Sequence, residues 1–138
     1  MTNESASGDA LRGMMSKARE KLAAARRELD GGFSGEASSR AYYAVFHALS
    51  AVLASRRLAF SSHAQTLGAF NRQFVKTGIF PPETTRQLQR LFEDRQTADY
   101  DWASVMDPQT AAEDVADAGR ILDACAAYLA KTVPEFGD

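Results

Sequence analysis

Few side chains in this sequence of 138 residues can perform acid–base or nucleophilic chemistry. There are two histidines, His47 and His63, and a single cysteine, Cys125. Cys125 falls on an apolar helical stripe, where a thiol packs as a small hydrophobic group. The other candidates are the arginines and four tyrosines, at positions Tyr42, Tyr43, Tyr100 and Tyr128. The sequence has no glycine-rich phosphate loop, no Gly-x-Ser-x-Gly and no His-Glu-x-x-His, which argues against P-loop enzymes, α/β-hydrolases and zinc peptidases.

The two histidines have different sequence contexts. Ser62 and His63 open a capping box, Ser-His-Ala-Gln, at the start of an apolar helical pattern. Helix N-termini bind anions, so Ser62 and His63 are candidate phosphate contacts, and a simple capping role is the alternative. His47 follows Phe46 on a mostly apolar helix, which favours a hydrogen-bonded, partly buried imidazole.

The net charge of -2 conceals an asymmetry along the chain. Residues 1–98 hold 14 Lys and Arg against 9 Asp and Glu, whereas residues 99–138 hold 2 against 9. Arg86 and Arg90 share one helical face, and Arg95 nearly continues it. This track could carry an RNA backbone, with a solvated charged face as the alternative.

The elements that must position these residues are helices. Apolar residues recur at three and four positions over 11–29, 38–57, 62–78, 82–95 and 108–131. We therefore predict an all-α, five-helix up-and-down bundle in one domain, residues 9–132, between flexible termini at 1–8 and 133–138. Residues 96–107 keep Tyr100 and the only tryptophan without a helical stripe, so we expect a functional loop there, with Arg95 at an exposed helix end.

Cysteine content and hydropathy indicate the compartment. One cysteine excludes an internal disulfide or a cysteine-based zinc cluster. The N-terminus lacks a signal-peptide pattern, and no apolar run approaches the length of a membrane span. We therefore expect a cytoplasmic protein with no membrane partner.

Four blocks of the sequence resemble the small stand-alone proteins of the HEPN domain family. They are RAYYAVFHA at 40–48, SH at 62–63, FVKTG at 74–78 and LFEDRQTADYD at 91–101. The resemblance covers about residues 11–131. It implies a helical bundle that forms a homodimer, and in many members a metal-independent ribonuclease that needs no cofactor. The active site in those members is an Arg-x4-6-His motif at the dimer cleft.

The family motif lies just after the fourth helix, which in this sequence selects Arg95 rather than Arg40 or Arg57. Gln96 fits the residue that commonly follows the motif arginine, and Tyr100 occupies the histidine position. The guanidinium of Arg95 can donate hydrogen bonds to two phosphate oxygens at once. Tyr100 is a poor base, because a phenol with a pKa near 10 is ionised at about one part in a thousand at neutral pH. It suits a hydrogen-bond donor or an acid better.

The resemblance implies two functions. The first is a ribonuclease toxin silenced by a minimal nucleotidyltransferase antitoxin, with Arg95 and Tyr100 as catalytic residues. RNA phosphates would meet residues around them, namely Ser62, His63, Arg86, Arg90 and Gln96. The second is a non-catalytic dimeric module that docks a nucleotidyltransferase and helps bind its nucleotide or substrate. In the first, Tyr100 is also the expected acceptor of transferred AMP.

Overall fold

The computed structural model describes residues 7–101 and 105–136, and those residues form an all-helical bundle. The helices are α1 (Gly8–Asp30), α2 (Ser34–Ala54), α3 (His63–Phe70), α4 (Glu83–Tyr100) and α5 (Pro108–Thr132). A π-helical turn, η1 (Asn71–Val75), continues α3. The prediction of an all-α, five-helix fold is confirmed.

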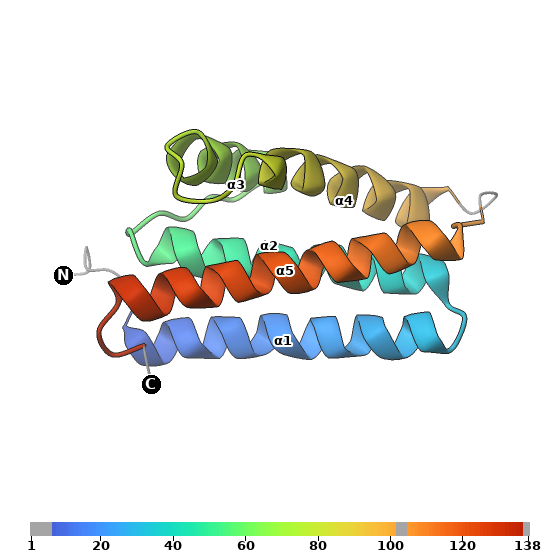
Figure 1. The fold of residues 1–138 in the computed structure, drawn as a ribbon, viewed down its shortest axis with the longest axis horizontal. Helices are drawn as coiled ribbons and strands as arrows, with labels where there is room; N and C mark the ends of the chain where they lie inside the picture. The colour runs from blue at the N-terminus through green and yellow to red at the C-terminus, as the bar shows by residue number, and fades with distance from the viewer. Residues whose placement is uncertain (1–6, 102–104, 137–138) are drawn as a thin grey trace.

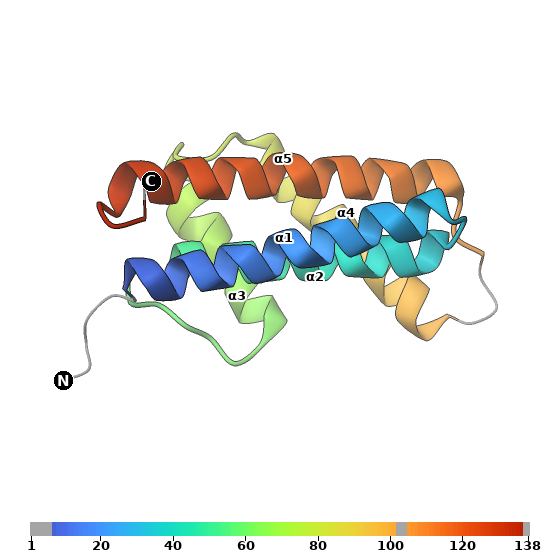
Figure 2. The same ribbon diagram turned by 90° about the horizontal axis from the view of Figure 1, so that it is seen from below.

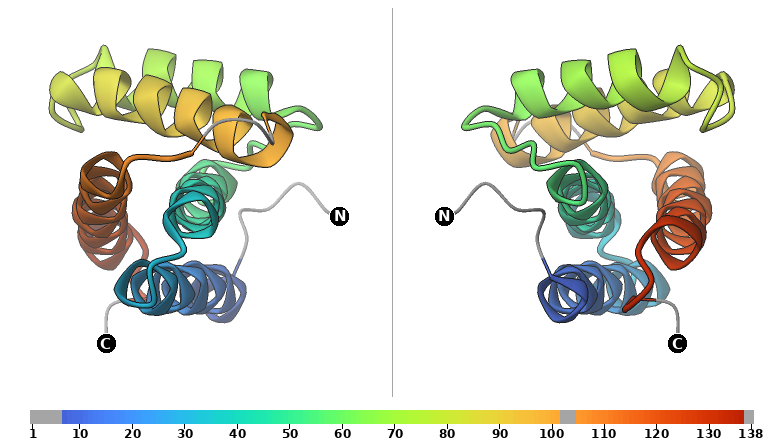
Figure 3. Two further views of the ribbon diagram at one scale, coloured as in Figure 1. Left: turned by 90° about the vertical axis from the view of Figure 1, so that its right-hand side faces the viewer. Right: turned by 90° about the vertical axis from the view of Figure 1, so that its left-hand side faces the viewer.

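The bundle has two layers (Figure 1). The long helices α1, α2 and α5 lie side by side, and α3 and α4 cover one side of them. Seen end-on, α1, α2 and α5 occupy three corners, with α3 and α4 lying across them (Figure 3). Figure 2 shows α4 crossing the long helices at an angle. Helix α2 contacts α1, α3, α4 and α5, and is therefore the central helix.

Hydrophobic spacing explains why these helices pack as they do. In α1 the buried positions Leu11, Met15, Ala18, Leu22 and Ala25 follow one another at intervals of three and four. That spacing puts them on one face, which lies against α2 and α5. Burial of such faces from all the helices supplies one continuous core.

Helix α2 differs from its predicted limits at both ends. It begins at Ser34 rather than residue 38, and it ends at Ala54 rather than residue 57. Arg57 adopts a left-handed φ of 65°, and the Leu58 amide donates to the Leu53 carbonyl at 3.0 Å. This is the Schellman arrangement, which stops a helix by turning the chain back on its last turn.

Helix α4 is longer than predicted. It continues through Gln96 and ends at Tyr100, so the first five residues of the expected loop 96–107 are helical. The stretch contains no glycine or proline, and Ala98 packs close to Gly35 at the start of α2. Arg95 is therefore a helix-interior residue and not an exposed helix end. The tryptophan of the expected loop lies outside the described residues.

Candidate functional site

Arg95 is buried against aromatic side chains of α2 and α4. Leu88, Leu91 and Arg95 lie on the buried face of α4, and Arg95 is only 6% exposed. Its guanidinium carbon lies 4.8 Å from the centroid of the Tyr42 ring and 5.6 Å from that of Tyr43. Aromatic faces attract a cation through their quadrupoles, so these rings stabilise the guanidinium without neutralising it.

Two further residues at the end of α4 complete the surroundings of Arg95. The Tyr100 ring centroid lies 6.0 Å from the guanidinium carbon, and Tyr100 is 73% exposed. Arg95 Nη1 and Asp99 Oδ2 form a loose ion pair at 3.7 Å. The helix therefore brings together the arginine and the tyrosine of the sequence motif, one buried and one at the surface.

His63 also lies in this group of side chains. We call Arg95, Tyr42, Tyr43, Tyr100 and His63 the cluster. His63 Nδ1 lies 2.9 Å from the Tyr42 hydroxyl oxygen, within hydrogen-bond distance. Its ring centroid lies 4.2 Å from that of Phe46. The position is fixed by the start of α3, where the Ser62 hydroxyl accepts a hydrogen bond from the Gln65 amide at 3.0 Å. The predicted capping role of Ser62 is thus present, and it sets His63 beside Tyr42.

The cluster holds its imidazole and its buried phenol in their neutral forms. Burial, and then the positive charge of Arg95, lower the pKa of His63. Burial raises the pKa of Tyr42 to about 12, against the opposing effect of Arg95. At neutral pH the cluster therefore presents one fixed cation beside a neutral imidazole and a neutral phenol.

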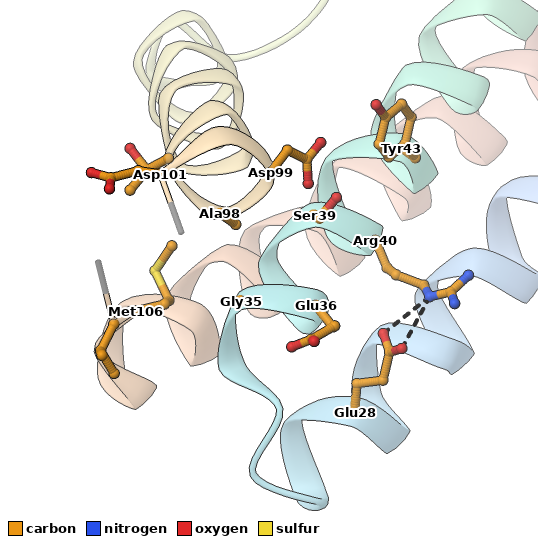
Figure 4. A pocket seen from close by; sticks show the side chains of 12 residues that line it. Glu28, Gly35, Glu36, Ser39, Arg40, Tyr43, Ala98, Asp99, Asp101 and Met106 are labelled. Atoms are coloured by element: carbon orange, nitrogen blue, oxygen red, sulfur yellow. Dashed lines mark hydrogen bonds and ion pairs between the residues drawn. The ribbon is translucent and has the colours of Figure 1, made fainter. Parts of the chain in front are cut away.

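A pocket of about 670 Å³ opens on one flank of the cluster, between the start of α2 and the end of α4 (Figure 4). Tyr43 and Asp99 line the pocket and also contact Arg95. The charged side chains of its described lining are mainly acidic, with carboxylates at Glu28, Glu36, Asp99 and Asp101. The one arginine in that lining, Arg40, donates a hydrogen bond to Glu28 at 3.0 Å. This flank repels anions.

The predicted basic track separates into residues with different surroundings. Arg90 binds the carboxylates of α5: its Nη2 lies 2.5 Å from Asp117 Oδ2, and its Nε lies 3.4 Å from Asp114 Oδ1. Arg86 and Gln96 are exposed. These contacts assign Arg90 a role in joining α4 to α5, and they give no support to its predicted contact with RNA.

A second polar centre surrounds Asp114 on α5. The side chain is fully buried and accepts a hydrogen bond from Ser38 Oγ on α2 at 2.7 Å. Burial, followed by a hydrogen bond with Asp94, raises the pKa of Asp114 to about 7. We call Ser38, Arg90, Asp94, Asp114 and Asp117 the acidic cluster.

The remaining candidates lie elsewhere. Burial and the charges of Lys21 and Lys17 lower the pKa of His47, which places this histidine toward α1. Cys125 is buried, and burial raises the pKa of its thiol, as an inert core cysteine requires. Within residues 7–101 and 105–136, no three His, Cys, Asp or Glu side chains are grouped to hold a metal ion. The same residues contain no helix with the length and apolarity to cross a membrane.

Sequence reasoning missed the roles of Tyr42 and Tyr43. The apolar spacing of α2 puts Tyr42 on a core-facing stripe with Phe46 and Leu49, and Tyr42 is 1% exposed. Two adjacent tyrosines at the middle of the most apolar helix were the available signal, because a buried phenol needs a polar partner. The structure supplies His63 as that partner and Arg95 as the cation over the ring.

The HEPN domain family matches residues 11–128 of the chain. A UPF0332 protein of Thermotoga maritima is 44% identical over 84 residues, which are 61% of this chain and 64% of that protein. A UPF0332 protein of Gloeobacter violaceus is 31% identical over 119 residues, 86% of this chain and 94% of that protein. A Methanocaldococcus jannaschii protein named "Putative toxin" is 31% identical over 88 residues, 64% of this chain and 60% of that protein. The chain thus spans less than two thirds of the Thermotoga and Methanocaldococcus relatives.

Proposed function

Because the chain belongs to the HEPN domain family, we propose that it is the toxin of a toxin–antitoxin pair and acts as a metal-independent endoribonuclease. The name of the Methanocaldococcus relative supports the toxin role. The observation that carries the ribonuclease role is the placement of Arg95, a cation whose ion pair with Asp99 is loose, beside exposed Tyr100. A cation is needed for the charge that develops on phosphate, and a phenol can protonate a leaving oxygen.

The approach of RNA follows from the charges on either side of Arg95. The pocket on the α2 flank has an acidic lining and disfavours phosphate. Away from that pocket, His63 at the start of α3 lies beside Tyr42 next to the capping residue Ser62, and Gln96, which follows Arg95, is exposed. RNA phosphates would meet Ser62, His63 and Gln96 there. Exposed Arg86 lies on the side of α4 that faces α5, where it lines a pocket with Asp117 and Arg120, so its predicted contact would need RNA that extends over that side as well.

A homodimer would complete the site. One chain offers a single buried guanidinium and a single exposed phenol, whereas two copies facing each other bring together two Arg95 and two Tyr100 side chains. Light scattering should give about twice the chain mass of 15.0 kDa. A stable monomer at micromolar concentration would contradict the shared site.

The proposed antitoxin is a minimal nucleotidyltransferase that transfers AMP to Tyr100. Tyr100 is 73% exposed at the end of α4, so its phenol can enter the active site of a partner. Tyr128 cannot do the same, because its ring packs edge-on to Phe74 with centroids 5.4 Å apart. A phosphodiester on Tyr100 would put a negative charge beside Arg95 and occupy the place of RNA phosphate.

Cleavage of RNA by the purified dimer in the presence of a chelator tests the ribonuclease role. We expect cleavage by the wild type and cleavage slower by about 100-fold or more in Arg95→Met, a variant of similar side-chain length without the charge. Mass spectrometry after co-expression with the nucleotidyltransferase tests the regulation. We expect AMP on the peptide that contains Tyr100 and none in Tyr100→Phe, and AMP at other positions would contradict the proposed mechanism.

One observation favours a second function. Arg95 is only 6% exposed, which leaves little of its guanidinium for an RNA phosphate to reach and suits a residue that packs beneath a docking surface. In that case the chain is a non-catalytic dimeric module that binds a nucleotidyltransferase and helps hold its nucleotide or substrate. Stable binding of the nucleotidyltransferase by a wild-type protein that cleaves no RNA would establish this second function.

A further inference from the structure

The proposed cleavage reaction has a cation in Arg95 and an acid in Tyr100, but neither can remove the proton from a ribose 2′-hydroxyl at neutral pH. From the contacts around Tyr42 we infer that His63 is the general base of the site and that Tyr42 is the positioning residue that orients its ring. This inference rests on the proposed ribonuclease function and assigns its missing group.

The first argument is proximity. Tyr42 links the two residues, since Arg95 lies over its ring at 4.8 Å and its hydroxyl oxygen lies 2.9 Å from His63 Nδ1. His63 is at the start of α3, Tyr42 in the middle of α2 and Arg95 on α4, so three elements converge on this point. His63 is half-buried, so part of the ring is accessible to a substrate.

The second argument is the geometry of proton transfer. A base must accept a proton at one ring nitrogen while the other keeps its hydrogen bond. The contact with Tyr42 uses Nδ1. If Nδ1–H donates to the Tyr42 oxygen, Nε2 carries the free lone pair, and the same hydrogen bond persists after Nε2 is protonated. Tyr42 would then orient His63 through both states of the ring.

The third argument is the protonation state. The groups that face His63 are Tyr42 and Tyr43 from α2 and Arg95 from α4. Burial, and then the charge of Arg95, lower the pKa of His63, so the imidazole is neutral at pH 7. Burial raises the pKa of Tyr42 to about 12, so the phenol does not compete for the proton. His63 is therefore already in the form that a base requires.

The reaction balances with these groups. His63 Nε2 takes the proton of the 2′-hydroxyl, and the resulting oxygen forms a bond to phosphorus. The bond from phosphorus to the 5′-oxygen breaks, and that oxygen takes the proton of the Tyr100 phenol. The products are a 2′,3′-cyclic phosphate and a 5′-hydroxyl. The imidazolium then loses its proton to water, and the phenolate regains one.

The test uses RNA cleavage by the full-length dimer as a function of pH, with the other histidine of the chain as a matched control. We expect His63→Ala to lower the cleavage rate by about 100-fold or more, and free imidazole to restore part of it. His47→Ala should cleave like the wild type. Tyr42→Phe keeps the imidazole but loses the acceptor for Nδ1–H, which stabilises the protonated ring. The acidic limb of its pH–rate profile should therefore move to lower pH.

Nitrogen NMR of the protein with labelled histidine provides a readout that does not depend on activity. We expect His63 to carry its proton on Nδ1 at neutral pH, and a proton on Nε2 would overturn the assignment as base. Wild-type cleavage that His63→Ala does not slow would also overturn it while leaving the ribonuclease function intact. Absence of cleavage by the wild type would overturn the ribonuclease function and, with it, this inference.

Discussion

Two arginines of α4, Arg90 and Arg95, lie about one and a half turns apart and meet opposite surroundings. The Arg90 side chain is 39% exposed, yet carboxylates of Glu113, Asp114 and Asp117 lie within 3.6 Å of it. Arg95 is 6% exposed, and the carboxylate paired with it, that of Asp99, lies at 3.7 Å. The more exposed arginine is therefore the more neutralised one.

The comparison separates exposure from available charge. Carboxylates cancel the charge of Arg90 and bind it to α5, so the ion pairs of Arg90 stabilise the contact between α4 and α5. Aromatic rings hold Arg95 by their quadrupoles, which leaves its net charge to act on an incoming anion. A basic residue is thus better judged by the chemistry of its partners than by its solvent-accessible area.

Removing the charge of each arginine in turn tests this difference between Arg90 and Arg95 most directly. Arg95→Met should lower RNA cleavage by about 100-fold or more, because the site loses the cation that stabilises the charged phosphate. Arg90→Met should leave cleavage by the folded protein near the wild-type rate. Its cost should be about 1–3 kcal/mol of unfolding free energy, since it breaks the ion pairs that join a partly exposed arginine of α4 to Asp114 and Asp117 of α5. Cleavage assays and urea denaturation measure the two effects.

Arg95→Lys gives the matched control for the first variant. It keeps the charge but loses the planar fork, so we expect cleavage between those of the wild type and Arg95→Met. Equal losses of cleavage in Arg90→Met and Arg95→Met, with both proteins folded, would show that the two arginines do not differ in function.

The acidic cluster should be detected in the pH dependence of stability. The pKa of Asp114 is raised to about 7 in the folded protein, above its unfolded value, so the folded state binds more protons between those two values. The contribution of Asp114 to stability is therefore full below its unfolded pKa and is lost as the pH rises toward 7. Asp114→Asn imitates the protonated acid and should remove this loss.

Urea denaturation at pH 5 to 8 measures the effect as the difference in unfolding free energy between Asp114→Asn and the wild type. We expect the difference to move in favour of the variant as the pH rises. Asp123→Asn, an exposed carboxylate of the same helix, is the control and should show no such trend. A constant difference for Asp114→Asn would mean that this carboxyl does not titrate in the range.

The smallest effect concerns the loose ion pair of Arg95. Asp99→Asn removes the carboxylate 3.7 Å from Arg95 Nη1. Because a loose ion pair contributes about 0.2–1 kcal/mol, we expect RNA to bind more tightly by up to about fivefold. Binding of a non-cleavable RNA, followed by fluorescence anisotropy, measures the change. Weaker binding would show that Asp99 positions the guanidinium and does not compete for it.

The helical class and the closeness of Arg95 to Tyr100 were predictable from local signals. The three-and-four spacing of apolar residues predicted the five helices, and the capping residue Ser62 marked the start of α3. The pairing of Arg95 with Tyr100 came from a motif of contiguous residues. Such signals depend on neighbours along the chain, which a sequence displays directly.

Features that depend on contacts between helices were not predictable. In the last turn of α4, which the sequence did not predict, Ala98 lies close to Gly35 of α2. The neutralisation of Arg90 rests on carboxylates 23 to 27 residues later in the chain. The hydrogen bond between Tyr42 and His63 joins residues 21 positions apart. Periodicity assigns each residue to a face, but it does not identify the residue that the face meets.

Ser38 and Tyr42 stand one turn apart on α2, and each fastens a different neighbour. Ser38 holds Asp114 of α5, and the Tyr42 ring lies under Arg95 of α4. Two adjacent turns of α2 therefore fix the positions of α5 and α4 along its axis, the first through Ser38 and the second through Tyr42. A shift of α2 along its axis by one turn would break both contacts together. The Ser38–Asp114 hydrogen bond and the Tyr42–Arg95 contact would then be lost while every helix stays intact.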